Sequence, residues 1–106
     1  MSKIDLKKVS RADNLLAKGL GVIGWKDFGN RNGLLLTGTN SIHTYFVRFS
    51  LDLVFLDKNM KVIKLLKNLK PFRFSPIVWS AKHVLEMPNH SIEKFSIKVG
   101  DEINMV

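Results

Sequence analysis

The segment SIHTYFVRFSLDLVFLD, residues 41–57, is rich in the β-branched and aromatic residues that favour β-strands. Side chains alternate between the faces of a strand, so His43 and the other odd-numbered residues share one face, which we expect to be the core face. Arg48 and Asp52 lie on the other face, about 13 Å apart if the strand is straight. Because an unpaired buried guanidinium is costly, we expect Arg48 to be partly buried and held by a carboxylate, first Glu86 and second Asp52.

Length and composition indicate one globular domain. The chain has 106 residues, of which 45% are hydrophobic and 25% charged, so we expect residues 1–106 to form a single domain. The absence of cysteine excludes disulfides, cysteine nucleophiles and cysteine-bound zinc or iron–sulfur sites. The N-terminal MSKIDLKKVS has no apolar signal-peptide core, and no apolar run is long enough to cross a membrane, so we expect a cytoplasmic location.

Alternation and turn signals predict a mainly β chain with two short helices. Strands are expected at residues 3–7, 34–38, 41–57, 81–87 and 97–106. Ser10 is expected to cap a helix that ends at Gly19 or Gly21, and Ser91 to cap a single helical turn. Residues 61–69, KVIKLLKNL, fit either a helix or the return strand of a hairpin, and periodicity alone leaves both open.

The net charge of +8 is unevenly placed along the chain. A run of cations without an intervening carboxylate consists of Lys58, Lys61, Lys64, Lys67, Lys70, Arg73 and Lys82. Such a run is either a phosphate-binding footprint or a solvated surface. A spacing of three residues spreads charges around a helix instead of collecting them on one face, so we favour the solvated surface.

The segment KPFRFSPIVW, residues 70–79, interleaves aromatic and basic side chains. The residues concerned are Lys70, Phe72, Arg73, Phe74 and Trp79. The three rings could stack on bases while the two cations hold phosphates, as binding of single-stranded nucleic acid requires. The other interpretation is a loop whose rings close one end of the core, and we favour this core packing.

Catalytic and metal-binding patterns are weak in this sequence. His43, His83 and His90 have no metal-ligand spacing with one another or with carboxylates, so we expect no metal or cofactor. Ser41 and Ser50 lie near the first of these histidines, but neither has the motif that surrounds a serine nucleophile. The remaining candidate is a polar cluster made of His43, Arg48, Asp52 and Glu86.

Six motifs occur in an order and spacing that resembles a family of small prokaryotic proteins. They are KGLGVIGW, NGLLL, SIHTYFVRFSLDLVFLD, NLKPFRF, AKHVLEMPN and IKVGDE. From about residue 10 to residue 103 the chain is similar to the domain-of-unknown-function 192 family, and the central matches are Ile42, His43, Thr44, Arg48, Phe49, Asp52, Phe55 and Asp57. Val47, Ser50 and His90 stand where that family usually has Met, Pro and Gly.

The resemblance implies a mainly β, sandwich-like or barrel-like domain with one N-terminal helix and one short C-terminal helix. It also favours the hairpin strand for residues 61–69. Many members of the family begin with a secretion or lipoprotein signal, and MSKIDLKKVS does not resemble one. The family has no established activity, so the resemblance predicts a fold and no reaction.

The sequence therefore predicts a binding or accessory module that is not an enzyme and acts through protein interaction, because no catalytic constellation is visible. Nucleic-acid binding through the basic region from Lys58 to Lys82 is the alternative. A small-molecule or hydrolytic site around His43, Arg48 and Asp52 is the third hypothesis.

Overall fold

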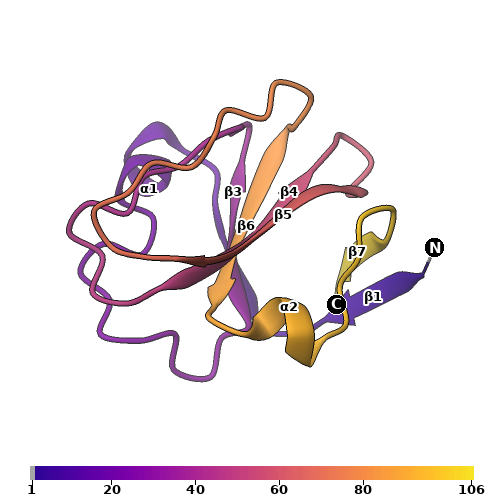
Figure 1. The fold of residues 1–106 in the computed structure, drawn as a ribbon, viewed down its shortest axis with the longest axis horizontal. Helices are drawn as coiled ribbons and strands as arrows, with labels where there is room; N and C mark the ends of the chain where they lie inside the picture. Colours follow the sequence, from indigo (N-terminus) through magenta and orange to yellow (C-terminus); the bar gives the residue numbers. More distant parts are fainter. Residues whose placement is uncertain (1) are drawn as a thin grey trace.

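The computed structural model describes residues 2–106, except the side chains of residues 15 and 16. Its elements are, in chain order, β1 (Lys3–Leu6), β2 (Val9–Ala12), α1 (Leu15–Leu20), β3 (Gly33–Thr37), β4 (Leu51–Leu56), β5 (Val62–Leu69), β6 (His83–Pro88), α2 (Ser91–Lys94) and β7 (Glu102–Met105). Five strands form one sheet in the order β2-β3-β6-β4-β5, antiparallel except for the parallel pair β2 and β3 (Figure 1). Strands β1 and β7 form a separate parallel pair. The predicted mainly β fold with two short helices is confirmed, and neither sheet closes on itself within the described part of the chain.

Strand β4 is covered by apolar side chains on both of its faces. All six of its residues are buried. Leu51, Leu53 and Phe55 belong to one core cluster, whereas Val54 and Leu56 belong to a second cluster on the opposite face. Continuous apolar runs of this kind are typical of strands that are buried on both sides. The prediction that only odd-numbered side chains face the core is therefore wrong for β4.

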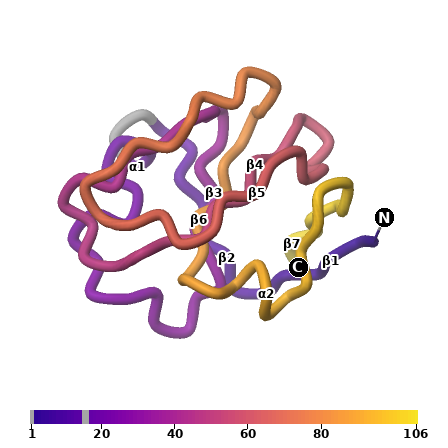
Figure 2. Tube along the Cα trace, viewed as in Figure 1, coloured from indigo at the N-terminus to yellow at the C-terminus, as the bar shows by residue number. Residues whose placement is uncertain are grey.

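Different parts of the chain cover the two faces of the sheet. Val22 and Phe28, which follow α1, belong to the first cluster. Leu6 of β1, Ile92 of α2 and Ile103 of β7 belong to the second. Figure 2 shows α1 at one end of the molecule and α2, β1 and β7 at the other. The long connections before β4 and β6 lie on the α1 side.

The strand predicted for residues 41–57 is shorter than expected, because only its last part forms β4. Residues 41–50 are irregular, and the buried Thr44 explains why they leave the sheet. Its hydroxyl donates a hydrogen bond to the carbonyl of Lys70 at 2.6 Å and accepts one from the backbone N–H of Arg73 at 2.9 Å. These bonds join the segment to the loop after β5 instead of to a neighbouring strand.

The first helix begins later than predicted. Ser10 lies in β2, where it pairs with Leu34 of β3, so it does not cap a helix. The N-cap of α1 is Asn14, whose side chain accepts a hydrogen bond from the backbone N–H of Ala17 at 2.8 Å. Formation of the parallel pair β2 and β3 explains the delay, since Ala12 of β2 is buried in the first core cluster.

The hairpin interpretation of KVIKLLKNL is confirmed, because these residues form β5 antiparallel to β4. The carboxylate of Asp57 organises the turn between the two strands. Its Oδ1 atom accepts hydrogen bonds from the backbone N–H groups of Asn59 at 2.8 Å and Lys61 at 3.0 Å.

Asp52 of β4 is buried and joins three elements, namely β4, β5 and α2. A β-bulge places two residues of β5, Lys67 and Asn68, opposite this single residue of β4. Asp52 Oδ1 accepts a hydrogen bond from the backbone N–H of Asn68 at 3.0 Å, and Oδ2 accepts one from the backbone N–H of Ile92 in α2 at 2.9 Å. The predicted capping role of Ser91 is wrong, because the Ser91 hydroxyl donates to the Pro88 carbonyl and Asp52 accepts from the helix.

Replacing Asp52 with alanine is expected to lower the free energy of unfolding by about 2–5 kcal/mol, because two backbone donors lose their acceptor. Urea denaturation measures this change. Glu93→Ala serves as the control, since Glu93 lies in α2 and its side chain forms an exposed ion pair with Lys67. Equal stability of the two variants would show that the Asp52 hydrogen bonds do not hold the three elements together.

Candidate functional site

A pocket of about 680 Å³ opens on the α1 side of the five-stranded sheet. Three segments of the chain line it: residues 18–22 at the end of α1, residues 38–43 after β3, and the segment around Trp79, Ala81 and Lys82 before β6. A volume of this size suits a small organic ligand. Within the described residues no group of three metal-ligating side chains lies close together.

Glu86 of β6 lies at the inner end of this pocket. In the sheet it stands between Leu34 of β3 and Leu53 of β4, and it is 2% exposed. Its Oε1 atom has no hydrogen-bond partner among the described residues. A Cβ atom at Gly21, which has φ +50°, would lie 3.1 Å from that oxygen, so the carboxyl group lies directly against the end of α1.

Burial raises the pKa of Glu86 from its ordinary value of 4.5 to about 8. The cause is the loss of solvent, because a carboxylate is poorly stabilised among apolar side chains that offer it no hydrogen bond. The side chain is therefore mostly protonated at pH 7. In this state it has an O–H group that can donate a hydrogen bond, as well as an oxygen that can accept one.

The outer part of the pocket is basic and polar. Lys18 and Lys82 are cations there, and Thr39 and Ser41 provide hydroxyl groups. Trp79 is 79% exposed, so its ring lies at the mouth of the pocket. Because the inner carboxyl group is mostly uncharged at pH 7, Glu86 does not balance the two lysine charges, and the carboxylate near Lys18 is Asp13, which does not line the pocket.

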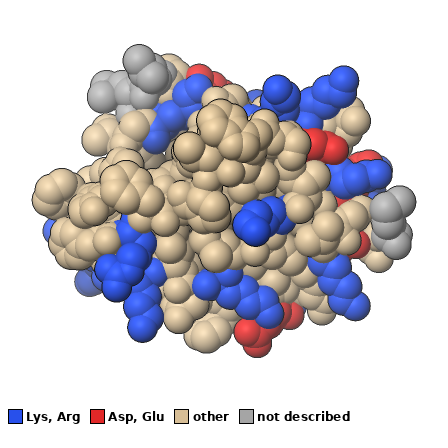
Figure 3. All heavy atoms as spheres, turned by 45° about the horizontal axis from the view of Figure 1, so that its top comes forward, with Lys and Arg blue, Asp and Glu red and all other residues tan. Residues whose placement is uncertain are grey.

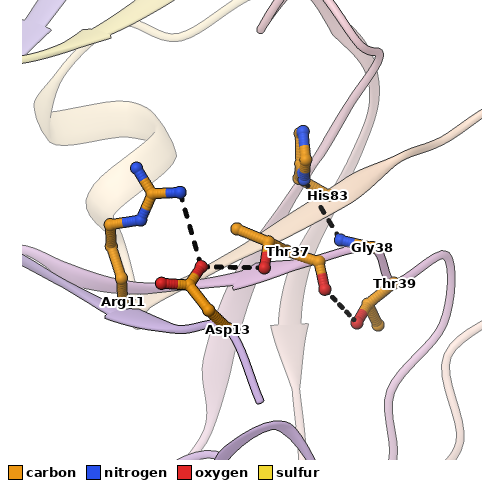
Figure 4. A network of polar contacts seen from close by, with 6 residues as sticks. All are labelled: Arg11, Asp13, Thr37, Gly38, Thr39 and His83. Atoms are coloured by element: carbon orange, nitrogen blue, oxygen red, sulfur yellow. Dashed lines mark hydrogen bonds and ion pairs between the residues drawn. The ribbon is translucent and has the colours of Figure 1, made fainter. Parts of the chain in front are cut away.

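A network of polar contacts holds the pocket wall at Gly38 and Thr39 (Figure 4). Asp13 Oδ1 accepts hydrogen bonds from the Thr37 hydroxyl at 2.9 Å and from Arg11 at 3.4 Å, and the Thr37 hydroxyl does most to hold the pKa of Asp13 below its usual range. The backbone N–H of Gly38 donates to His83 Nδ1 at 3.2 Å.

Burial lowers the pKa of His83, and the nearby Arg11 charge lowers it further. Both effects favour the neutral imidazole, which is the form that accepts the hydrogen bond from Gly38. His83 therefore has a structural role in positioning the wall of the pocket.

An exposed group of rings adjoins the pocket, and we call it the aromatic surface. It consists of His43, Tyr45, Phe46, Phe72 and Phe74. Neighbouring ring centroids lie between 5.2 Å, for Tyr45 and Phe74, and 6.4 Å, for His43 and Phe74. His43 also lines the pocket, so the two features are continuous.

Two rings of the aromatic surface are carried by backbone in the left-handed region. Phe46 has φ 66° and Phe72 has φ 61°, conformations that are unfavourable for bulky residues. Thr44 holds both in place. Its carbonyl accepts hydrogen bonds from the N–H of Phe72 at 3.0 Å and from the N–H of Val47, the residue after Phe46, at 3.2 Å. Phe46 and Phe74 are each 71% exposed.

Only part of the predicted polar cluster comes together. His43 and Glu86 line the same pocket, whereas Asp52 holds α2 and β5 at a different place. Arg48 is exposed and forms no ion pair within residues 2–106, so its predicted burial against Glu86 or Asp52 is wrong. The physical reason is that Thr44 holds this segment against residues 70–73, so the chain joins the sheet only at Leu51, after Arg48.

The predicted basic and aromatic residues lie at the surface. Lys70, Phe72, Arg73, Phe74 and Trp79 are all exposed, so the interpretation of these rings as a plug of the core is wrong. Figure 3 shows Lys and Arg in separate groups on the face that it draws. Gly21, one of the two glycines expected to end the first helix, is the C-cap of α1. Its contact with Glu86 and the organising role of Thr44 were not identified from the sequence, because both depend on residues distant along the chain.

Comparison with known proteins identifies relatives without an assigned activity. The model of a family described as "Uncharacterized ACR", DUF192, matches residues 2–105. A UPF0127 protein of Thermococcus sibiricus is 38% identical over 64 residues, which are 60% of this chain and 41% of that protein. A UPF0127 protein of Pyrococcus furiosus is 40% identical over 63 residues, which are 59% of this chain and 53% of that protein. The matches thus span about half the length of these curated relatives.

Two crystal structures have the same fold. One is a protein of unknown function from Novosphingobium aromaticivorans, with a TM-score of 0.77 and 17% identity over 87% of this chain and 70% of that one. The other is described as a putative transcription regulator of Sinorhizobium meliloti, with a TM-score of 0.75 and 17% identity over 87% of this chain and 76% of that one. At this identity the likeness concerns the fold alone.

Glu86→Gln is expected to remove a pH dependence of stability. Between pH 4.5 and pH 8 the folded chain holds a proton on Glu86 that the unfolded chain has released. Raising the pH through this window therefore destabilises the native protein, by up to about 1.4 kcal/mol for each pH unit, and the glutamine variant lacks this loss. Urea denaturation from pH 5 to pH 8 measures the growing difference.

The control for this series is Glu102→Gln, because Glu102 is an exposed glutamate that pairs with Lys3 at the surface. It is expected to follow the native protein at every pH. Parallel curves for the native protein and Glu86→Gln would contradict the assignment of Glu86 as a buried, protonated acid.

Proposed function

The chain belongs to the DUF192 family of uncharacterised proteins, and we propose that it is a non-enzymatic binding module that acts through protein interaction. The aromatic surface is the part that contacts the partner. The observation that carries this proposal is the exposure of Phe46 and Phe74, at 71% each, within a contiguous group of five rings. Exposed contiguous apolar patches mark interaction sites, and aromatic residues dominate the energy of such contacts.

The backbone supports the same proposal. Left-handed conformations at Phe46 and Phe72 cost free energy, and the hydrogen bonds of the buried Thr44 maintain them. Without these conformations the two rings would not be presented side by side, with centroids 6.3 Å apart. Strain of this kind gathers at functional sites, which favours a role in recognition over a role in packing.

Charge indicates the chemistry of the partner. The chain has a net charge of +8, and the exposed Lys70 and Arg73 flank Phe72. A partner with apolar anchors and acidic side chains at its rim complements this surface, since opposite charges speed association and fix its orientation. We therefore infer an acidic protein as the partner.

Nucleic-acid binding is the second candidate, because Lys70, Phe72, Arg73 and Phe74 place rings beside cations. Two observations make it weaker. The rings of Tyr45 with Phe72 and Phe74 meet edge to face, which leaves their faces partly covered. On the face drawn in Figure 3 the cations also lie in separate groups instead of a continuous groove.

The third hypothesis, a site of His43, Arg48 and Asp52, has no geometric support, because Asp52 holds α2 and Arg48 is exposed. No helix within the described residues is long and apolar enough to cross a membrane. The expected cytoplasmic location stays a prediction.

The double variant Phe46→Ser, Phe74→Ser is expected to weaken partner binding at least about tenfold, because truncating aromatic anchors removes about 1–2 kcal/mol or more. The native chain captures its partner from the cells that produce it, and the purified pair is then titrated by calorimetry. Val99→Ser is the matched control, since Val99 is 62% exposed but lies outside the aromatic surface.

We expect to purify a protein that binds the native chain and Val99→Ser equally. The same protein is expected to bind the double variant far more weakly. Equal affinity for all three chains contradicts the proposal. The second candidate would replace the proposal if the chain captured only single-stranded nucleic acid. The affinity would then fall steeply as salt is raised, and it would be lost in the double variant Lys70→Gln, Arg73→Gln.

A further inference from the structure

The pocket next to the aromatic surface has features that protein interaction does not use. It has an inner carboxyl group, apolar walls and a basic outer part. The only residue that the pocket shares with the aromatic surface is His43. Ligand binding in this pocket is therefore independent of the partner protein proposed above.

We propose that this pocket binds a small ring-bearing organic carboxylate, whose oxygen accepts a hydrogen bond from Glu86 while Lys18 and Lys82 supply the opposite charge. The first support is the buried Oε1 atom of Glu86, which lacks a partner among the described residues. Buried polar groups in folded proteins are almost always hydrogen-bonded, and a ligand in the pocket would complete this one.

The charge of the pocket selects an anion. Glu86 is mostly protonated at pH 7, since burial raises its pKa to about 8, so it presents a hydrogen-bond donor and no charge to a ligand. The lysines are then the charges that a ligand meets. A cationic ligand would be repelled by both of them, and a metal ion would find fewer than three ligating side chains here within the described residues.

A carboxylate also suits the inner hydrogen bond. The O–H group of a protonated acid donates to a carboxylate oxygen in a short, charge-assisted hydrogen bond. No covalent bond is made or broken, and the proton stays on Glu86. The proton on Glu86 makes this contact possible, because two ionised carboxylates at the same place would repel each other.

The apolar walls of the pocket favour a ligand that contains a ring. Val22, Leu36 and Val47 are buried apolar residues that line the pocket, and the exposed Trp79 stands at its mouth. Flat apolar ligands gain from such walls, since aromatic rings stack or meet edge to face. Gly21 contributes by its lack of a side chain, because a Cβ atom there would lie 3.1 Å from Glu86 Oε1.

The test uses benzoate as the probe, with benzamidine and benzyl alcohol as cationic and neutral molecules of similar shape. Amide resonances of the full chain are followed by nuclear magnetic resonance during each titration. We expect benzoate to shift resonances of residues 18–22, 38–43 and 79–86 with a Kd on the order of 1 mM, a usual value for so small a ligand. Benzamidine is expected to leave them unchanged, and benzyl alcohol to bind more weakly than benzoate.

The pH dependence identifies the role of Glu86. As this acid ionises with a pKa of about 8, the affinity for benzoate is expected to fall about tenfold between pH 7 and pH 9. Glu86→Gln keeps an N–H donor, so it is expected to bind benzoate without this decline. Lys18, Lys82 and His43 also face the pocket. If Glu86 causes the decline in affinity, the decline persists in His43→Gln. If Lys18 supplies charge to the ligand, Lys18→Gln weakens binding at every pH.

Three results would overturn the proposal. Tighter binding of benzamidine than of benzoate would show that Glu86 acts as an anion toward a cationic ligand. An affinity for benzoate that is the same at pH 7 and pH 9 would show that the proton on Glu86 is not used. The absence of benzoate-dependent shifts in residues 18–22, 38–43 and 79–86 would show that the pocket does not bind this class of molecule.

Discussion

Burial of the central strands on both faces is the constraint on which the rest of the structure depends. Strands β4 and β6 stand in the middle of the five-stranded sheet, with one core cluster on each side. A polar group placed there has little access to water, so it must find a partner within the protein or remain unsatisfied. Asp52 on β4 and Glu86 on β6 are the two acids that these strands carry, and both are buried.

The two acids meet this constraint in opposite ways. Asp52 accepts backbone hydrogen bonds with both oxygens, and by doing so it joins the bulge of β5 to the first turn of α2. Glu86 has an oxygen without a partner, lines a pocket, and has its pKa raised by burial to about 8. The first arrangement stabilises the fold. The second leaves a buried oxygen without a partner, which costs stability and makes Glu86 the candidate for binding a ligand.

The sequence predicts most of the strands of this fold, because their signals are local, but it assigned the residues of β2 to the first helix. Alternation identified β1, and the Asp57 turn together with the family resemblance identified the β4–β5 hairpin. The irregular residues 41–50 could not be predicted in the same way, since their path depends on hydrogen bonds from Thr44 to residues 70–73, far along the chain. The same cause misplaced Arg48. His43 and Glu86 were candidates for one polar cluster, but the predicted strands gave no reason for these two side chains to meet, and only the structure places both at one pocket.

The most direct test of this account is the titration of the Glu86 carboxyl carbon, followed by its carbon-13 chemical shift in the full chain. The account predicts a single midpoint near pH 8, because burial without a hydrogen-bond partner disfavours the charged form. A midpoint near the ordinary value of 4.5 would show that the group is solvated or paired, and would contradict both the uncharged inner acid and the anion site built on it.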